Sequence, residues 1–116
     1  MATDTPAAPT RSARALVTVP QGARRGEVIE VRALIAHPME TGHRADGAGG
    51  VVPRDIIRRF TCRLDGETVF AAELHPAVAA NPLLSFPLVA RPGTLTLHWE
   101  GDRGFAHTET VALRVA

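Results

Sequence analysis

Apolar and polar residues alternate along most of this chain, and the alternation predicts an all-β protein. Across Val28–Ala36, apolar side chains share one face while Glu30 and Arg32 take the other, as in a strand with one buried side. Thr94–Glu100 has the same period of two, with Trp99 on the buried side. Helical spacing is weak throughout. Seven strands are predicted in this way, over residues 15–19, 28–36, 57–64, 67–74, 83–89, 94–100 and 105–115.

Turn residues separate these strands. Asp65-Gly66 predicts a tight hairpin, because glycine tolerates the positive φ that such turns need. Pro87 cannot donate a hydrogen bond within a sheet, so its strand is expected at an edge. Short strands with such turns predict an immunoglobulin-like antiparallel β-sandwich of about seven strands, with a small closed barrel as the alternative. Residues 1–14 indicate a disordered N-terminal arm, and residues 15–116 a single sandwich domain.

Composition limits the classes of function. The 116 residues suit one hydrophobic core, and the net charge of +1 gives no support to nucleic-acid binding. No segment approaches the roughly 20 apolar residues that cross a membrane. An export signal is not readable either, because Glu27 and Glu30 interrupt the run after Arg24-Arg25.

Few residues suggest catalysis. Cys62 is the only cysteine, and its place between Phe60 and Leu64 predicts a core thiol rather than a redox site. Ser12 and Ser85 lie in no nucleophile motif, so a serine hydrolase is not indicated. The five histidines show no metal-binding spacing. A metal-dependent enzyme built on the loop histidines remains an alternative, as does a generic periplasmic β-sandwich binding module.

The long loop from His37 to Pro53 is the least ordinary segment. It carries apolar residues that either meet a partner or fold back onto the sandwich. Leu34 is predicted on the outer face of its strand, either as a partner contact or as an ordinary exposed leucine. Arg59 and Arg63 share an outward face in a basic cluster that either meets an acidic partner or is simply solvated.

One segment resembles a known family. From Leu34 to Phe60 the chain reads Leu-Ile-Ala-His-Pro-Met-Glu-Thr-Gly-His-Arg-Ala-Asp-Gly and then Val-Val-Pro-Arg-Asp-Ile-Ile-Arg-Arg-Phe. This segment is similar to the signature region of the SoxZ family, and the similarity continues through Ala80-Asn81-Pro82 and the Trp99 strand. Leu83 departs from the aromatic residue expected after Asn-Pro.

The resemblance implies a non-catalytic scaffold subunit, without cofactor, that pairs with a SoxY-like sulfur-carrier chain in thiosulfate oxidation. It also implies a heterodimer or higher assembly in the periplasm, co-exported with a signal-bearing partner and in transient contact with other Sox enzymes. The chain ends in Ala116 without the Gly-Gly-Cys-Gly-Gly terminus of a carrier. The residues predicted to bind the partner are His37, Pro38, Met39, Glu40, Thr41, Gly42, Arg44, Val51, Val52, Pro53, Arg54, Arg59 and Arg63.

Overall fold

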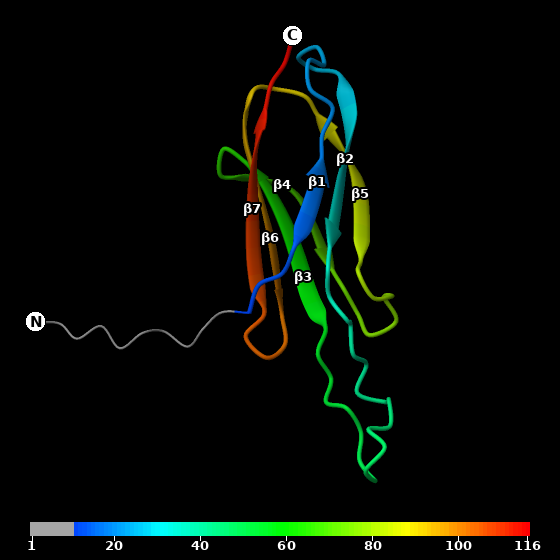
Figure 1. Ribbon diagram of the computed structural model, residues 1–116. Helices are drawn as coiled ribbons and strands as arrows, with labels where there is room; N and C mark the ends of the chain where they lie inside the picture. Colours follow the sequence, from blue (N-terminus) through cyan, green and yellow to red (C-terminus); the bar gives the residue numbers. More distant parts are fainter. Residues whose placement is uncertain (1–10) are drawn as a thin grey trace, which may run out of the picture.

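The computed structural model describes residues 11–116, which form two antiparallel β-sheets packed as a sandwich (Figure 1). All seven predicted strands are present, with ends within two residues of the predicted ones, so the all-β sandwich prediction is confirmed. Within these residues there is no helix, and hence none suited to crossing a membrane. The strands are β1 (Ala15–Thr18), β2 (Val28–Ile35), β3 (Ile57–Leu64), β4 (Glu67–Glu73), β5 (Leu83–Val89), β6 (Gly93–Gly101) and β7 (Ala106–Leu113).

The strands divide into two separate sheets, so the closed-barrel alternative is wrong. One sheet has the order β1-β2-β5 and the other β4-β3-β6-β7. β5 lies at an edge, as Pro87 predicts. Asp65 and Gly66 make the hairpin between β3 and β4 with φ values of 49° and 87°, which confirms the predicted turn.

Aromatic side chains join the inner faces of the two sheets. The ring of Phe60 on β3 lies 5.0 Å from that of Trp99 on β6 and 5.8 Å from that of Phe86 on β5. All three side chains are buried. Because these contacts span both sheets, Phe60→Ala would remove about 3–5 kcal/mol from the free energy of unfolding.

Two residues on the outer faces of the sheets, Thr61 and Leu34, differ in how far they are exposed to solvent. Thr61 lies between Arg59 and Arg63 on the outward face of β3, yet it is only 7% exposed. Its cross-strand neighbours are Ala71 on β4 and His98 on β6. Leu34 faces outward as predicted and is 38% exposed. Its cross-strand neighbours are Leu16 and Leu83, which are also exposed, so the three leucines form a row across the outer face of the β1-β2-β5 sheet.

The start of the described chain is attached to the sandwich. Arg11 forms a parallel bridge with Phe105, in which its N–H donates to the carbonyl of Gly104 and its own carbonyl accepts from Ala106 N. This segment was predicted to belong to the N-terminal arm. The rest of that prediction, for residues 1–10, lies outside the described residues.

Candidate partner interface at one end of the sandwich

The segment between β2 and β3, which we call the connector (residues 36–56), projects beyond the sheets at one end of the molecule (Figure 1). Its two arms pair with each other. Glu40 and Asp55 exchange backbone hydrogen bonds of 2.8 Å in both directions, and Val52 N donates to Arg44 O at 2.7 Å. An isolated bridge joins Ala45 to Val51 further out. The connector is therefore a hairpin-like projection with a defined backbone path.

Polar groups at the tip of the connector satisfy one another. The Asp46 carboxylate accepts hydrogen bonds from the backbone N–H groups of Ala48 at 2.7 Å and Gly50 at 3.1 Å. These bonds lower the pKa of Asp46. Arg44 forms an ion pair with Glu40 at 2.9 Å on the flank. The apolar exception is Val51, whose residue is 57% exposed.

Met39 lies in the core, which corrects one of the two interpretations of the loop. It was predicted among partner-binding apolar residues, yet it is 4% exposed and packs in the main hydrophobic cluster. Its backbone turns inward through a positive φ of 51°. Ile57 N lies 3.2 Å from the Met39 sulfur, within hydrogen-bonding range. Met39 therefore anchors the connector, while Val51 stays at the surface.

His37 forms the second anchor. Its Nδ1 accepts a hydrogen bond from Met39 N at 2.9 Å, and its backbone N–H donates to the Asn81 side chain at 3.0 Å. Its ring meets Phe105 edge-on at 4.7 Å. Burial lowers the pKa of His37, against the opposing influence of the Asp55 charge. The buried His37 is thus held neutral as a structural residue, rather than displayed to a partner.

Asp102 joins the base of the connector to the turn between β6 and β7. Its carboxylate accepts hydrogen bonds from Arg54 Nη2 at 2.9 Å and from Ile56 N at 3.2 Å. It also forms ion pairs with Arg54 Nε at 2.8 Å and with Arg58 Nε at 3.2 Å. Burial opposes ionisation, but the Arg54 and Ile56 hydrogen bonds and the arginine charges lower the pKa of Asp102. A Cβ at Gly101 would collide with the carbonyl of Ile56, so glycine permits this close approach.

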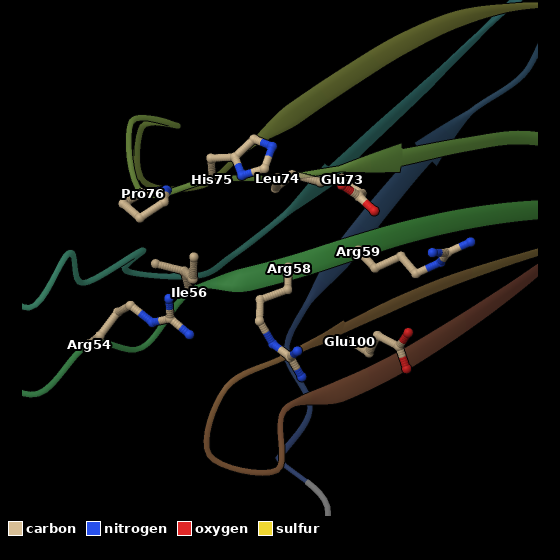
Figure 2. A pocket seen from close by; sticks show the side chains of 9 residues that line it. All are labelled: Arg54, Ile56, Arg58, Arg59, Glu73, Leu74, His75, Pro76 and Glu100. Carbon is tan, nitrogen blue, oxygen red and sulfur yellow. The ribbon is translucent and has the colours of Figure 1, made fainter.

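A cleft of about 330 Å³ lies beside this base, on the outer face of the larger sheet. Figure 2 shows Arg59 on β3 between Glu73 on β4 and Glu100 on β6, with Arg58 on the side nearer Arg54. Both arginines face outward because the pairing of β3 with β6 shifts register between Ile57 and Arg59. The cleft is lined by Arg54, Ile56, Arg58, Arg59, Glu73, Leu74, His75, Pro76 and Glu100.

The structure brings together only part of the predicted set. Arg54 and Arg59 both line the cleft, which we call the arginine cleft. Arg63 is exposed on the same strand, as predicted, but it does not line the cleft and lies between Thr68 and Thr96. The prediction that these residues bind a partner stays a prediction. Asp102, the acidic residue at the base of the connector, was not predicted as a site residue. It lies in the turn between β6, the strand that contains Trp99, and β7.

Cys62 is buried, as predicted. It is 0% exposed, and burial raises its pKa from the ordinary value of 9.0 to about 11. The thiol is therefore protonated at neutral pH and closed to solvent. No three His, Cys, Asp or Glu side chains gather as a possible metal site within residues 11–116. That range includes all five histidines, so the alternative of a metal-dependent enzyme has no ligand cluster there.

Comparison with solved structures identifies the class of fold. The chain is similar to a superoxide reductase (neelaredoxin) from Ignicoccus hospitalis, with a TM-score of 0.68 and 14% identity over 90% of this chain and 82% of that one. It is also similar to the sulfur carrier protein SoxY from Chlorobium limicola f thiosulfatophilum, with a TM-score of 0.63 and 12% identity over 93% and 84% of the two chains. At such identities these likenesses show a shared β-sandwich fold alone.

The sequence itself gives the family. The family described as "Sulphur oxidation protein SoxZ" matches residues 17–112, which is most of the chain. The chain belongs to the SoxZ family, and the resemblance seen in residues 34–60 is confirmed. Comparison with curated proteins finds no match. Family membership assigns the chain a role in Sox sulfur oxidation.

Proposed function

We propose that this chain is a non-catalytic scaffold subunit that pairs with a SoxY-like chain, and that the pair presents covalently bound sulfur intermediates to the Sox enzymes during thiosulfate oxidation. The observation that carries the proposal is the burial of Cys62. It is the only cysteine of a chain that belongs to a sulfur-oxidation family. The sulfur must then be carried by another chain.

The chemistry of a sulfur carrier supports this division of work. A carrier cysteine must reach solvent as a thiolate, because the thiolate is the nucleophile that bonds to sulfur species. Cys62 meets neither requirement, because its side chain has no surface exposed to solvent and its pKa of about 11 keeps the thiol protonated. A partner with an accessible cysteine would supply what this chain lacks.

The connector and the arginine cleft are the surfaces we propose for contact with the partner. Val51 offers an exposed apolar group at the tip, and the backbone bonds of the connector hold that group in place before binding. A surface that is already ordered loses less conformational entropy on association. The charged walls of the cleft, with Arg59 between Glu73 and Glu100, suit a partner segment that carries both signs of charge.

The cellular compartment is part of the proposal. We propose that the chain works in the periplasm and reaches it by export together with a signal-bearing SoxY-like partner, as the SoxZ resemblance implies. Fractionation of cells with and without the partner gene tests this. The chain should enter the periplasmic fraction only when the partner is present, and periplasmic chain without the partner would contradict it.

Co-expression tests the pairing directly. The untagged chain is produced with a tagged SoxY-like chain from the same genome, and affinity purification is followed by native mass spectrometry. We expect a complex with one copy of each chain as its smallest unit. Recovery of the tagged chain alone, with this chain folded in the flow-through, would overturn the proposed function.

A further inference from the structure

The two long sides of the sandwich differ in how they are closed. On one side the segments beside β1 and β7 are joined, because Ala23 and Val115 form a parallel bridge and Gly22 N donates to Arg114 O at 3.2 Å. On the other side β4 and β5 are the edges of their sheets. Within residues 11–116 no backbone hydrogen bond joins β4 to β5. The outer edge of β4 is therefore open.

The direction of the free backbone groups on β4 follows from one hydrogen bond. Leu74 N donates to Arg58 O at 2.9 Å, so the Leu74 amide points toward β3. Successive residues of a strand point their backbone groups to opposite edges. The N–H and C=O groups of Ala71 and Glu73 therefore point away from the sheet, and both residues are exposed. Such a row is a template for an added strand.

Two hollows flank this edge. The rings of Phe70 on β4 and Phe86 on β5 stack 4.3 Å apart at an angle of 4° and bridge the gap between the sheets. Toward the connector end, a hollow of about 350 Å³ is lined mainly by apolar residues, including Ala72, Val78 and Leu84. On the far side of the stack, a hollow of about 340 Å³ has walls that include Val69, Pro87 and Leu88.

An open edge beside two hollows defines the chemistry of its occupant. Strand addition gains affinity from main-chain hydrogen bonds, and pockets for alternate side chains give it specificity. The facing edge of β5 is the poorer template because Pro87 has no N–H. The pairing of β3 with β4 shifts between Cys62 and Arg63, with Phe70 and Thr68 as partners, so Val69 is bulged and the regular edge covers residues 70–74.

We propose that the β4 edge, residues 70–74, binds an extended segment of the SoxY-like partner as an added strand, with an apolar side chain entering the hollow toward the connector end. This inference rests on the proposed function for the identity of the partner. It is supported by continuity, because Glu73 and Leu74 line both the arginine cleft and the adjoining hollow. The partner segment would thus run from the cleft along β4.

Amide hydrogen exchange in the free chain and in the co-purified complex tests the inference. The outward amides of Ala71 and Glu73 should exchange at least about tenfold more slowly in the complex, because each gains a hydrogen-bond partner. The Ala72 amide points toward β3 and serves as the internal control, with much smaller change. A complex in which Ala71 and Glu73 exchange as fast as in the free chain would overturn the strand inference and leave the proposed function standing.

A matched pair of variants gives a second test. Ala71→Pro removes the outward N–H at an edge where proline is tolerated, and Ala71→Thr keeps the N–H in a residue that favours strands. We expect the proline variant to bind the partner about tenfold more weakly than the threonine variant. If Ala71→Pro does not fold, the exchange measurement decides.

Failure of the wild-type chain to form any complex would overturn the proposed function together with this inference. Concentration-dependent protection of Ala71 in the isolated chain would identify a second copy as the occupant and overturn the assignment to the partner.

Discussion

Arg11 and Asp55, 44 residues apart, form a two-bonded ion pair, with Nη1–Oδ1 at 3.0 Å and Nη2–Oδ2 at 2.7 Å. The pair ties the first described residue to the base of the connector. We expect Asp55→Asn to lower the free energy of unfolding by about 1 kcal/mol, since the side chains are only partly shielded from water. Urea unfolding measures this. The control is Glu30→Gln, which removes a solvent-exposed pair with Arg32 and should change stability by less than about 0.5 kcal/mol. Equal effects of the two variants would contradict an anchoring role for Asp55.

The division of the connector into an anchored base and an exposed tip predicts opposite effects of two substitutions. Met39→Ala should lower the free energy of unfolding by about 2–4 kcal/mol, because Met39 is buried in the core. Val51→Asp should leave unfolding unchanged and weaken partner binding about tenfold, because it places a charge on the exposed apolar tip.

Ala48→Asp is the matched control for Val51→Asp. It adds the same charge at another exposed position of the tip without removing a large apolar side chain. Thermal unfolding and titration calorimetry with the partner separate the outcomes. Native affinity for Val51→Asp, or an equal loss for both variants, would show that the Val51 side chain is not part of the interface.

The buried thiol of Cys62 should make the free energy of unfolding depend on pH in the alkaline range. The chain has no lysine and no tyrosine, so Cys62 is the side chain that titrates between pH 9 and pH 11. Because burial raises its pKa, the folded state retains the proton that the unfolded state loses. The contribution of the protonated Cys62 thiol to the free energy of unfolding should be fully present below pH 9.0 and should be lost as the pH rises toward about 11.

Cys62→Ala provides the comparison. The variant should be less stable at neutral pH and should lack the alkaline decline, so the two stability curves converge as pH rises. Urea unfolding at a series of alkaline pH values measures both curves. Rapid reaction of a thiol reagent with the native wild-type protein at pH 8, or parallel curves for the two proteins, would show that the Cys62 thiol is not buried as described.

Arg59 and Arg63 share an exposed strand face but have different neighbours. Arg59 lies directly between Glu73 and Glu100, whereas Arg63 lies between two threonines. The charge of Arg63 is thus less compensated, and we expect Arg63→Gln to slow association a few-fold and to reduce its salt dependence more than Arg59→Gln does. Stopped-flow kinetics with the partner at several salt concentrations measures this. A larger effect at Arg59 would show that compensation by neighbouring carboxylates does not decide which arginine attracts the partner.

The sequence predicted what depends on local pattern. Alternation predicted the seven strands, the inward orientation of Cys62 and the outward orientation of Leu34. Each of these predictions needs only the period of two along a single strand. Pro87 indicated an edge strand for the equally local reason that it lacks an N–H.

Features that depend on distant residues were not predictable in this way. Met39 enters the core through a positive φ that methionine rarely adopts. The sequence pattern of the loop does not show this backbone conformation, so it left open whether Met39 is buried or exposed. Arg58 faces outward because of a register shift against β6, which alternation within β3 does not show. Asp102 gathers Arg54 and Arg58 only because the turn after β6 meets the connector in three dimensions.

Intact-mass analysis of both subunits after turnover tests the central claim most directly. The complex is incubated with thiosulfate and the Sox enzymes, the chains are separated without reduction, and the mass of each is measured. The account predicts sulfur adducts on the SoxY-like chain alone, with this chain at its unmodified mass, because Cys62 is buried and protonated. A sulfur adduct on Cys62 of the folded chain, formed during turnover, would contradict the account.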